Sequence, residues 1–363
     1  MESNGVDEVI TNIDDLRNDF KNITFSKFQK SKAKQELIKC IYNNKIENAN
    51  YWSAEFICAG HYLDLWEIII LYATRYIHSG NPKLPIYLNM RFDNFSSIIN
   101  VGYTNDMLIL RNNNKIRKLF SEIICVLCYS NKKQIYQQIK LNKSEEFDLI
   151  NLSTKFKAPN VSFVETVFKD DDPTELLIPI NELIYNITTG NMIEVCYWYE
   201  WIIEYENISN KKKKICNCQA RSYAPVGSQN HIIWIIWDIL FYYTNPENSI
   251  YKNTSSLPIV NKIIKSLYSL FIIKYKSTSK TKRKYIIYYA FSILTDNIDF
   301  DTALINDTNK DKIKVIVEKI DNVYRDIKKN EETPANDTDN PLKNHKKSNM
   351  EKTIERLEIM NNF

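Results

Sequence analysis

The stretch NYWSAEFICAGHYLDLWEIIILYATRYIH, residues 50–78, decides the fold class. Its apolar side chains recur every three or four residues, which is the period of one face of an α-helix. The members of this face are Trp52, Phe56, Ala59, Leu63, Trp66, Ile70 and Ala73. Gly60 interrupts the pattern, so we expect either a kink or a close helix contact there. The stretch predicts one helix from about Tyr51 to about His78.

The same spacing returns along most of the chain. It predicts further helices over 191–207, 257–275, 283–295 and 311–328. Glycine is scarce, with 6 residues in 363, against an average near 7%. Glycine-rich phosphate loops and β-rich folds with many tight turns are therefore excluded. We predict an all-α protein of antiparallel helical hairpins, arranged as a bundle or a solenoid-like stack, with a flexible C-terminal tail.

Changes in composition suggest how the chain is divided. We expect a polar N-terminal segment (1–35), an N-terminal helical domain (36–142), a connector (143–172), a basic helical domain (173–329), a flexible linker (330–349) and a terminal helix (350–363). The linker is almost without apolar residues, so burial cannot offset the entropy of ordering it. The terminal helix carries Ile354, Leu357 and Met360. It is too short to be stable alone and should dock on the body or on a partner. Where the connector ends, Asp172, Pro173 and Glu175 resemble a helix-capping box.

A strong charge asymmetry is the most informative feature for function. Between Glu206 and Asp296 lie fourteen basic residues and only two acids, a net charge of +12 in a chain of net charge +4. Cationic side chains neutralise phosphates, and tyrosines interleaved with them can stack on unpaired bases. The interleaved tyrosines are Tyr251, Tyr268, Tyr275, Tyr285, Tyr288 and Tyr289. The residues predicted to bind nucleic acid or another polyanion are Lys211, Lys212, Lys213, Lys214, Arg221, Lys274, Lys276, Lys280, Lys282, Arg283 and Lys284. The alternative is that these charges lie on solvated loops and helix faces, without a ligand.

The cysteines favour a reducing compartment and provide no metal site. Seven cysteines at scattered spacings are typical of free thiols. No signal peptide follows Met1, and no apolar run reaches the roughly 20 residues of a membrane span. Cys216, Cys218 and His231 offer three ligands, whereas structural zinc takes four. Cys125 and Cys128 lie in an apolar run and are expected to pack in the core.

One constellation could support catalysis. Glu55, Cys58, His61 and Asp64 are spaced three apart on the predicted helix, and a Cys–His pair can supply a nucleophile and its base. No oxyanion-hole glycines or third orienting group accompany them. We therefore assign no catalytic residue, no metal and no cofactor, and expect the protein not to be an enzyme. The tryptophans, including the pairs Trp198/Trp201 and Trp234/Trp237, are expected to anchor helix packing.

Several short segments carry a resemblance to known proteins. They are residues 50–61 (NYWSAEFICAGH), 65–67 (LWE), 197–204 (YWYEWIIE) and 233–238 (IWIIWD). In these segments the chain resembles uncharacterised helical proteins of nucleocytoplasmic giant DNA viruses, of the mimivirus-like and algal-virus lineages. The resemblance would cover about residues 35–300. It assigns no activity and no catalytic residue, and it implies a place in the host cytoplasm, at the virus factory, or in the virion.

These observations give three expectations for function. The first is a non-enzymatic accessory or scaffold protein that binds nucleic acid or a nucleoprotein complex through its basic surface. The alternative is a structural or virion-associated protein whose partners are only other proteins. An enzyme with an unfamiliar helical active site is the third. A continuous positive surface from Lys211 to Lys284 would favour the first expectation, and dispersed lysines the second.

Overall fold

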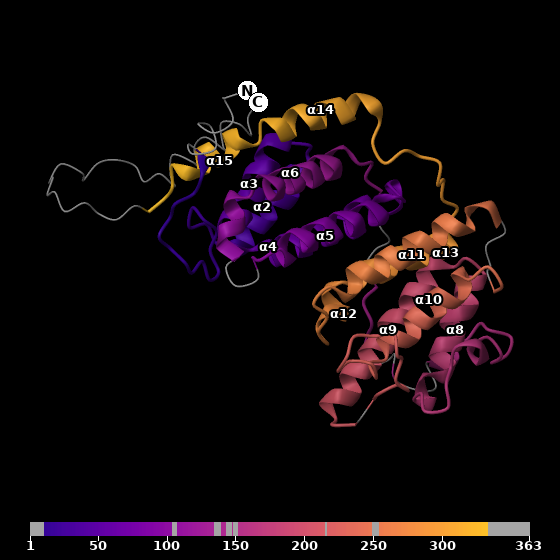
Figure 1. The fold of residues 1–363 in the computed structure, drawn as a ribbon. Helices are drawn as coiled ribbons and strands as arrows, with labels where there is room; N and C mark the ends of the chain where they lie inside the picture. The colour runs from indigo at the N-terminus through magenta and orange to yellow at the C-terminus, as the bar shows by residue number, and fades with distance from the viewer. Residues whose placement is uncertain are drawn as a thin grey trace, which may run out of the picture. The chain divides into compact units, whose positions relative to one another are not determined.

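The computed structural model describes residues 11–103, 107–133, 139–142, 147, 152–214, 216–248 and 254–332. Over these residues the chain is all-α, as predicted (Figure 1). No strand forms within the described ranges, and the nearest approach to one is an isolated bridge between Ile23 and Gln29. The predicted terminal helix and nearly all of the predicted linker lie outside the described residues.

The chain forms two compact units that interleave along the sequence. The first comprises Met1–Ala73, Met90–Asn131 and Ala303–Phe363, and the second comprises Thr74–Asn89 and Lys132–Thr302. The predicted domains were continuous segments, whereas each unit is made of separate segments. Residues 74–89 and 132–142, expected in the N-terminal domain, belong to the second unit. Residues 303–329, expected in the basic domain, belong to the first unit, because the helices after Ala303 pack on helices from the N-terminal part of the chain.

The first unit is built around α3 (Ile46–Cys58). This helix contacts α2 (Lys30–Tyr42), α4 (Tyr62–Tyr72), α6 (Asn114–Tyr129) and α15 (Asp321–Lys328), and α14 (Asp307–Glu318) packs on α6. A 3-10 helix, Met107–Asn112, precedes α6. Because α14 and α15 are separate, the single helix expected over 311–328 is in fact two helices. The residues of α5 (Leu84–Asn100) are divided between the two units.

The long helix predicted over 51–78 is broken at Gly60. Gly60 has φ +74°, in the left-handed region, and its N–H donates to Ile57 O while the His61 N–H donates to Phe56 O. This pair of hydrogen bonds is the Schellman motif that ends α-helices. A Cβ added at Gly60 would lie 3.1 Å from Leu108 Cδ2. Gly60 thus ends α3 and also allows a close contact, and only the continuity of the helix was predicted wrongly.

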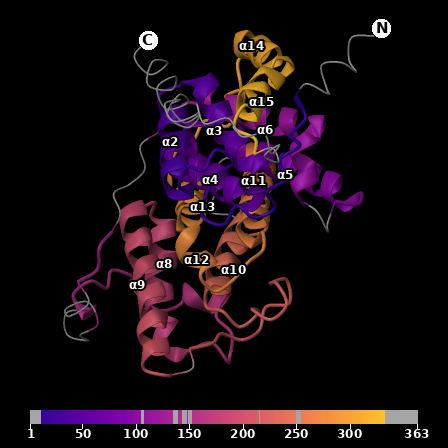
Figure 2. The same ribbon diagram turned by 90° about the vertical axis from the view of Figure 1, so that its left-hand side faces the viewer.

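The second unit surrounds α13 (Lys284–Thr295), whose residues from Tyr285 to Leu294 are all buried. α8 (Leu177–Thr188) and α9 (Met192–Lys211) form a hairpin, and both contact α13 (Figure 2). α10 (Ile233–Thr244) and α11 (Leu257–Ile272) also pack on it, and α12 (Ser279–Lys282) is a single turn just before it. A π-helix, Ala73–Ile77, begins at the boundary between the two units. The remaining short elements are 3-10 helices at His78–Gly80, Val164–Thr166, Thr174–Leu176 and Thr254–Ser256.

The predicted anchors of packing are in the core. All six tryptophans are buried, and Trp52 is the most exposed of them at 6%. Cys125 and Cys128 are also buried, on α6, and burial raises the pKa of Cys125 to about 11. These apolar and aromatic side chains hold the helices of each unit together.

Candidate functional site

The four consecutive lysines at the end of α9 lie in solvent. Lys211 is the last residue of the helix, and Lys211 to Lys214 are all exposed. The chain leaves the helix through Lys213 at φ +57°, and the Lys214 N–H donates to Ser209 O at 2.9 Å. The turn therefore projects four ammonium groups from one helix end. None of them forms an ion pair with another described residue.

A buried ion pair places the second lysine cluster beside the same helix. Lys280, on α12, is 6% exposed and its Nζ contacts the Glu206 carboxylate of α9, which is also buried. α12 lies beside α9 in both views (Figures 1 and 2). Glu206 precedes Lys211 by five residues, about 7.5 Å of helix rise. The ion pair thus places α12 beside the C-terminal half of α9, the helix that ends in the four lysines.

Three lysines near α12 remain exposed. Lys274 follows the end of α11 with φ +45°, and Lys276 and Lys282 lie on either side of Lys280. The candidate basic surface is therefore made of Lys211, Lys212, Lys213, Lys214, Lys274, Lys276 and Lys282. Exposed charges are screened over about 8 Å at physiological salt. Neighbours within each cluster act together on a polyanion.

Arg221 does not belong to this surface, although the sequence placed it there. Its side chain is fully buried and donates to both oxygens of Asp172, at 2.5 and 2.7 Å, and to Asp238 Oδ2 at 2.7 Å. Tyr223 OH donates to the other oxygen of Asp238. Burial lowers the pKa of Arg221, but the hydrogen bonds to Asp172 and Asp238 outweigh it and raise that pKa above its usual value. The Arg221 guanidinium is thus paired with carboxylates inside the protein and does not face solvent.

The Arg221 cluster also revises the expected helix cap at Asp172. Asp172 accepts from the backbone N–H of Gln219 and of Lys169 as well as from Arg221. A 3-10 helix follows Pro173, and α8 begins only at Leu177. The carboxylate thus binds the loop that carries Arg221, at a distance of 49 residues along the chain, and does not cap α8.

Arg283, Lys280 and Lys284 are likewise held by internal partners. Arg283 is buried and its Nη1 donates to Phe271 O, the carbonyl near the end of α11. Lys284 Nζ lies 2.8 Å from Glu200 Oε1 on α9, which also accepts from Tyr288 OH at 2.5 Å. These groups fasten α13 and the turn before it to α9 and α11. They were predicted as surface cations because the sequence does not show which carboxylate or carbonyl of another helix will face them.

The interleaved tyrosines that the structure describes do not form a stacking platform. Tyr285, Tyr288 and Tyr289 are buried on α13, with Tyr289 OH donating to Asn81 O. Tyr275 OH lies 3.2 Å from His231 Nδ1, and Tyr268 OH donates to Tyr223 O. Tyr251 lies outside the described residues. The described tyrosines of this set are engaged in packing and in hydrogen bonds inside the protein.

The Glu55–Asp64 constellation holds a loop in place. The Glu55 carboxylate, fully buried, accepts from the N–H and the hydroxyl of Ser26. His61 Nε2 lies 3.0 Å from Phe20 O and 2.8 Å from Ile23 O. Two carbonyl acceptors require the proton on that nitrogen, so His61 serves as a donor to this loop. Cys58 is buried, and burial raises the pKa of its thiol well above the usual value, the opposite of an activated nucleophile.

Cys216 and Cys218 are buried, and Cys218 Sγ donates to His231 O at 3.1 Å. Within the described part of the chain, no cluster of three or more His, Cys, Asp or Glu side chains is arranged to hold a metal ion. Across the same residues, none of the helices combines the length and the apolar character needed to cross a membrane.

Comparison with known proteins adds no relative: no family model, no curated protein and no solved structure matches the chain. The chemistry of the site therefore rests on the basic surface itself.

Proposed function

We propose that this protein is a non-enzymatic accessory protein that binds nucleic acid, or a nucleoprotein complex, through the basic surface at the end of α9. The observation that supports the proposal is the Lys280–Glu206 ion pair, which holds α12, with exposed lysines on either side of Lys280, against the helix that ends in Lys211 to Lys214. Lysines that approach phosphates displace condensed counterions, and this supplies sequence-independent affinity.

The composition of the surface defines the kind of binding. Lysine presents a compact charge without the rigid two-pronged geometry by which arginine reads guanine. Of the tyrosines predicted to stack on bases, Tyr285, Tyr288 and Tyr289 are buried on α13. We therefore expect contacts to the phosphate backbone, weak dependence on base sequence, and no preference for single strands over duplexes.

A titration of the whole protein with labelled duplex and single-stranded DNA and RNA, at several salt concentrations, tests the proposal. Affinity should fall by about 0.9 log unit per log unit of salt for each phosphate neutralised on duplex DNA. An equal competition by heparin would show that charge alone is recognised. Absence of binding at low salt would favour the alternative, a structural or virion-associated scaffold with only protein partners.

A further inference from the structure

One arginine outside the lysine clusters is held by aromatic rings. Arg75 is the central residue of the π-helix Ala73–Ile77, and it belongs to the segment Thr74–Asn89 of the second unit. Its guanidinium carbon lies 5.4 Å from the ring centroid of Tyr76 and 5.0 Å from that of Tyr285, on α13. Cations are attracted to the faces of such rings. π-Helices are rare and are frequently found at functional sites.

The hydrogen-bond donors of Arg75 have no protein partner. Among the described residues, no carboxylate forms an ion pair with Arg75, and no acceptor receives a hydrogen bond from its guanidinium. The side chain is half-buried, but none of its nitrogens is shielded from solvent. Arg221 and Arg283, the other arginines of the second unit, are buried and donate to groups inside the protein. The N–H groups of Arg75 are therefore open to a ligand.

The chemistry of the side chain and its surroundings favours a phosphate. A guanidinium presents five N–H donors in a planar fork that matches two oxygens of a phosphate group. The two rings restrict its motion, so binding costs less side-chain entropy. Lys284 Nζ lies 5.8 Å from the centroid of the Tyr285 ring and is paired with Glu200. Lys282, three residues before Tyr285, is exposed and adds an unpaired positive charge.

We propose that Arg75 binds a phosphate group through two of its N–H donors, and that this phosphate belongs to the nucleic acid that contacts the exposed lysines. The second part of the inference rests on the proposed function. The three residues from Lys282 to Tyr285 span at most about 11 Å. Each strand of duplex DNA carries one phosphate per roughly 3.4 Å of helix axis. A few nucleotides are thus long enough to connect Lys282 with the Arg75 guanidinium.

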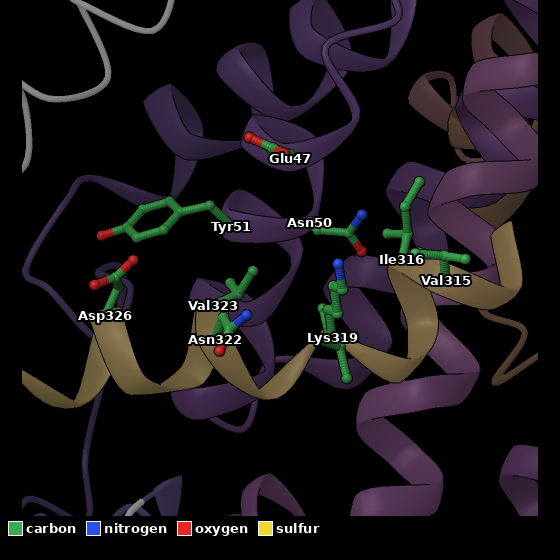
Figure 3. Close-up of a pocket in the computed structure, with 10 residues that line it drawn as sticks. Glu47, Asn50, Tyr51, Val315, Ile316, Lys319, Asn322, Val323 and Asp326 are labelled. Carbon is green, nitrogen blue, oxygen red and sulfur yellow. The ribbon is translucent and has the colours of Figure 1, made fainter. Parts of the chain in front are cut away.

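A groove in the first unit shows how differently other charged side chains are arranged. It has a volume of about 420 Å³ and lies between α3 on one side and α14 and α15 on the other (Figure 3). Its lining includes the basic Lys319 but also the acidic Glu47 and Asp326. Asp326 is already paired with Lys329. Such mixed charge does not select an anion, whereas Arg75 has no acidic partner among the described residues.

Binding of duplex DNA to the full-length chain at several salt concentrations is the first test. Arg75→Gln should lower the salt slope by about 0.9, the value for one phosphate, and should weaken binding roughly eightfold at 0.1 M salt. Arg75→Lys should restore the slope but not the full affinity, because lysine keeps the charge and lacks the fork. The matched control is Arg325→Gln, an exposed arginine of the first unit, which should behave as the wild type. A role in packing alone would leave the slope unchanged.

Modification of the wild-type protein by phenylglyoxal, mapped by mass spectrometry, is the second test and does not depend on the lysines. Duplex DNA should slow the modification of Arg75 severalfold and leave that of Arg325 unchanged, and inorganic pyrophosphate should do the same. Protection by pyrophosphate but not by DNA would support the phosphate site and assign it to a small phosphate compound.

The two tests separate this inference from the proposed function. If the wild type does not bind DNA at low salt, the proposed function fails, and protection by pyrophosphate still decides whether Arg75 is a phosphate site. If neither DNA nor pyrophosphate protects Arg75, and Arg75→Gln keeps the wild-type slope, the inference is overturned even where the lysines bind DNA.

Discussion

Two lysine-rich segments of the second unit resemble each other in sequence and differ in structure. Residues 211–214 are four lysines that end a helix and lie in solvent. Residues 280–284 also carry four basic side chains, but three of them are held by internal partners and only Lys282 is exposed. Whether a run of basic residues is exposed therefore depends on which carboxylates of other helices lie beside it, and only the structure shows this.

Residues of α9 decide the difference. Glu206 and Glu200 of this helix reach α12 and the start of α13, where they neutralise Lys280 and Lys284. No carboxylate from the described residues reaches the lysines beyond Lys211. Residues 280–284 therefore contribute mainly to stability, whereas residues 211–214 stay exposed. Variants of the two segments should differ accordingly.

The largest effect should come from the fully internal charge. Arg221→Met leaves Asp172 buried, without its two-pronged partner, and breaking a buried ion pair from one side costs about 3–5 kcal/mol. Lys212→Met, an exposed change of the same kind, should stay within about 0.5 kcal/mol. Urea unfolding monitored by tryptophan fluorescence measures both. Equal, small effects would mean that the Arg221 cluster does not hold the 216–231 loop in place.

The next effect concerns Lys280, which joins the two segments. Lys280→Met should cost about 2–3 kcal/mol, because it leaves Glu206 buried and unpaired. Adding Glu206→Leu should recover much of that loss, since a buried pair can be replaced by apolar groups at little cost. A double-mutant cycle gives the coupling energy. A coupling near zero would show that the pair does not fasten α12 to α9.

A buried group without an opposite charge provides a third contrast. His78 is 2% exposed and stacks on Tyr289, with ring centroids 4.7 Å apart. Burial, with a smaller contribution from Lys133, lowers its pKa from 6.5 to about 3. The unfolded chain then binds more protons than the native one between pH 6.5 and about 3. Stability should therefore fall on acidification through this window, by up to about 1.4 kcal/mol per pH unit.

The test of this prediction is the difference between wild type and His78→Phe. Both proteins lose stability in acid for other reasons as well, but those contributions cancel in the comparison. The wild type should lose more between pH 7 and pH 4. Parallel curves for the two proteins would show that His78 is not kept neutral by burial.

The smallest effect concerns Lys213, where backbone strain and the charge of the side chain can be tested separately. Lys213 occupies the left-handed region at φ +57°, where a side chain costs about 1 kcal/mol and glycine costs nothing. Lys213→Gly should therefore stabilise the protein by about that amount in thermal or urea unfolding, while slightly weakening polyanion binding. Lys212→Gly, at a residue with φ −81°, should not stabilise it.

The sequence predicted most helices because their apolar faces are local signals. α13 and α11 begin within one residue of the predicted starts. The break at Gly60 was missed because the spacing of the apolar residues on either side of it is the same whether the helix ends at the glycine or only bends there. For the candidate site, Lys211 to Lys214 are exposed at a helix end. Arg221 was predicted to lie on the surface because its partner Asp172 is 49 residues away in sequence. A count of the charges near Arg221 does not reveal so distant a partner.

The most direct test of the account is the salt dependence of duplex DNA binding in three matched proteins. Replacing Lys211, Lys212, Lys213 and Lys214 with Gln should lower the affinity, and it should lower the slope by about 0.9 for each phosphate that the variant no longer neutralises. The control replaces four exposed lysines of the first unit with Gln, namely Lys115, Lys118, Lys312 and Lys314, and should retain the wild-type slope. Unfolding curves of the variants should match that of the wild type, because exposed charges contribute little to stability. If both quadruple variants show the same slope as the wild type, or if the wild type does not bind at low salt, the end of α9 is not a polyanion-binding surface.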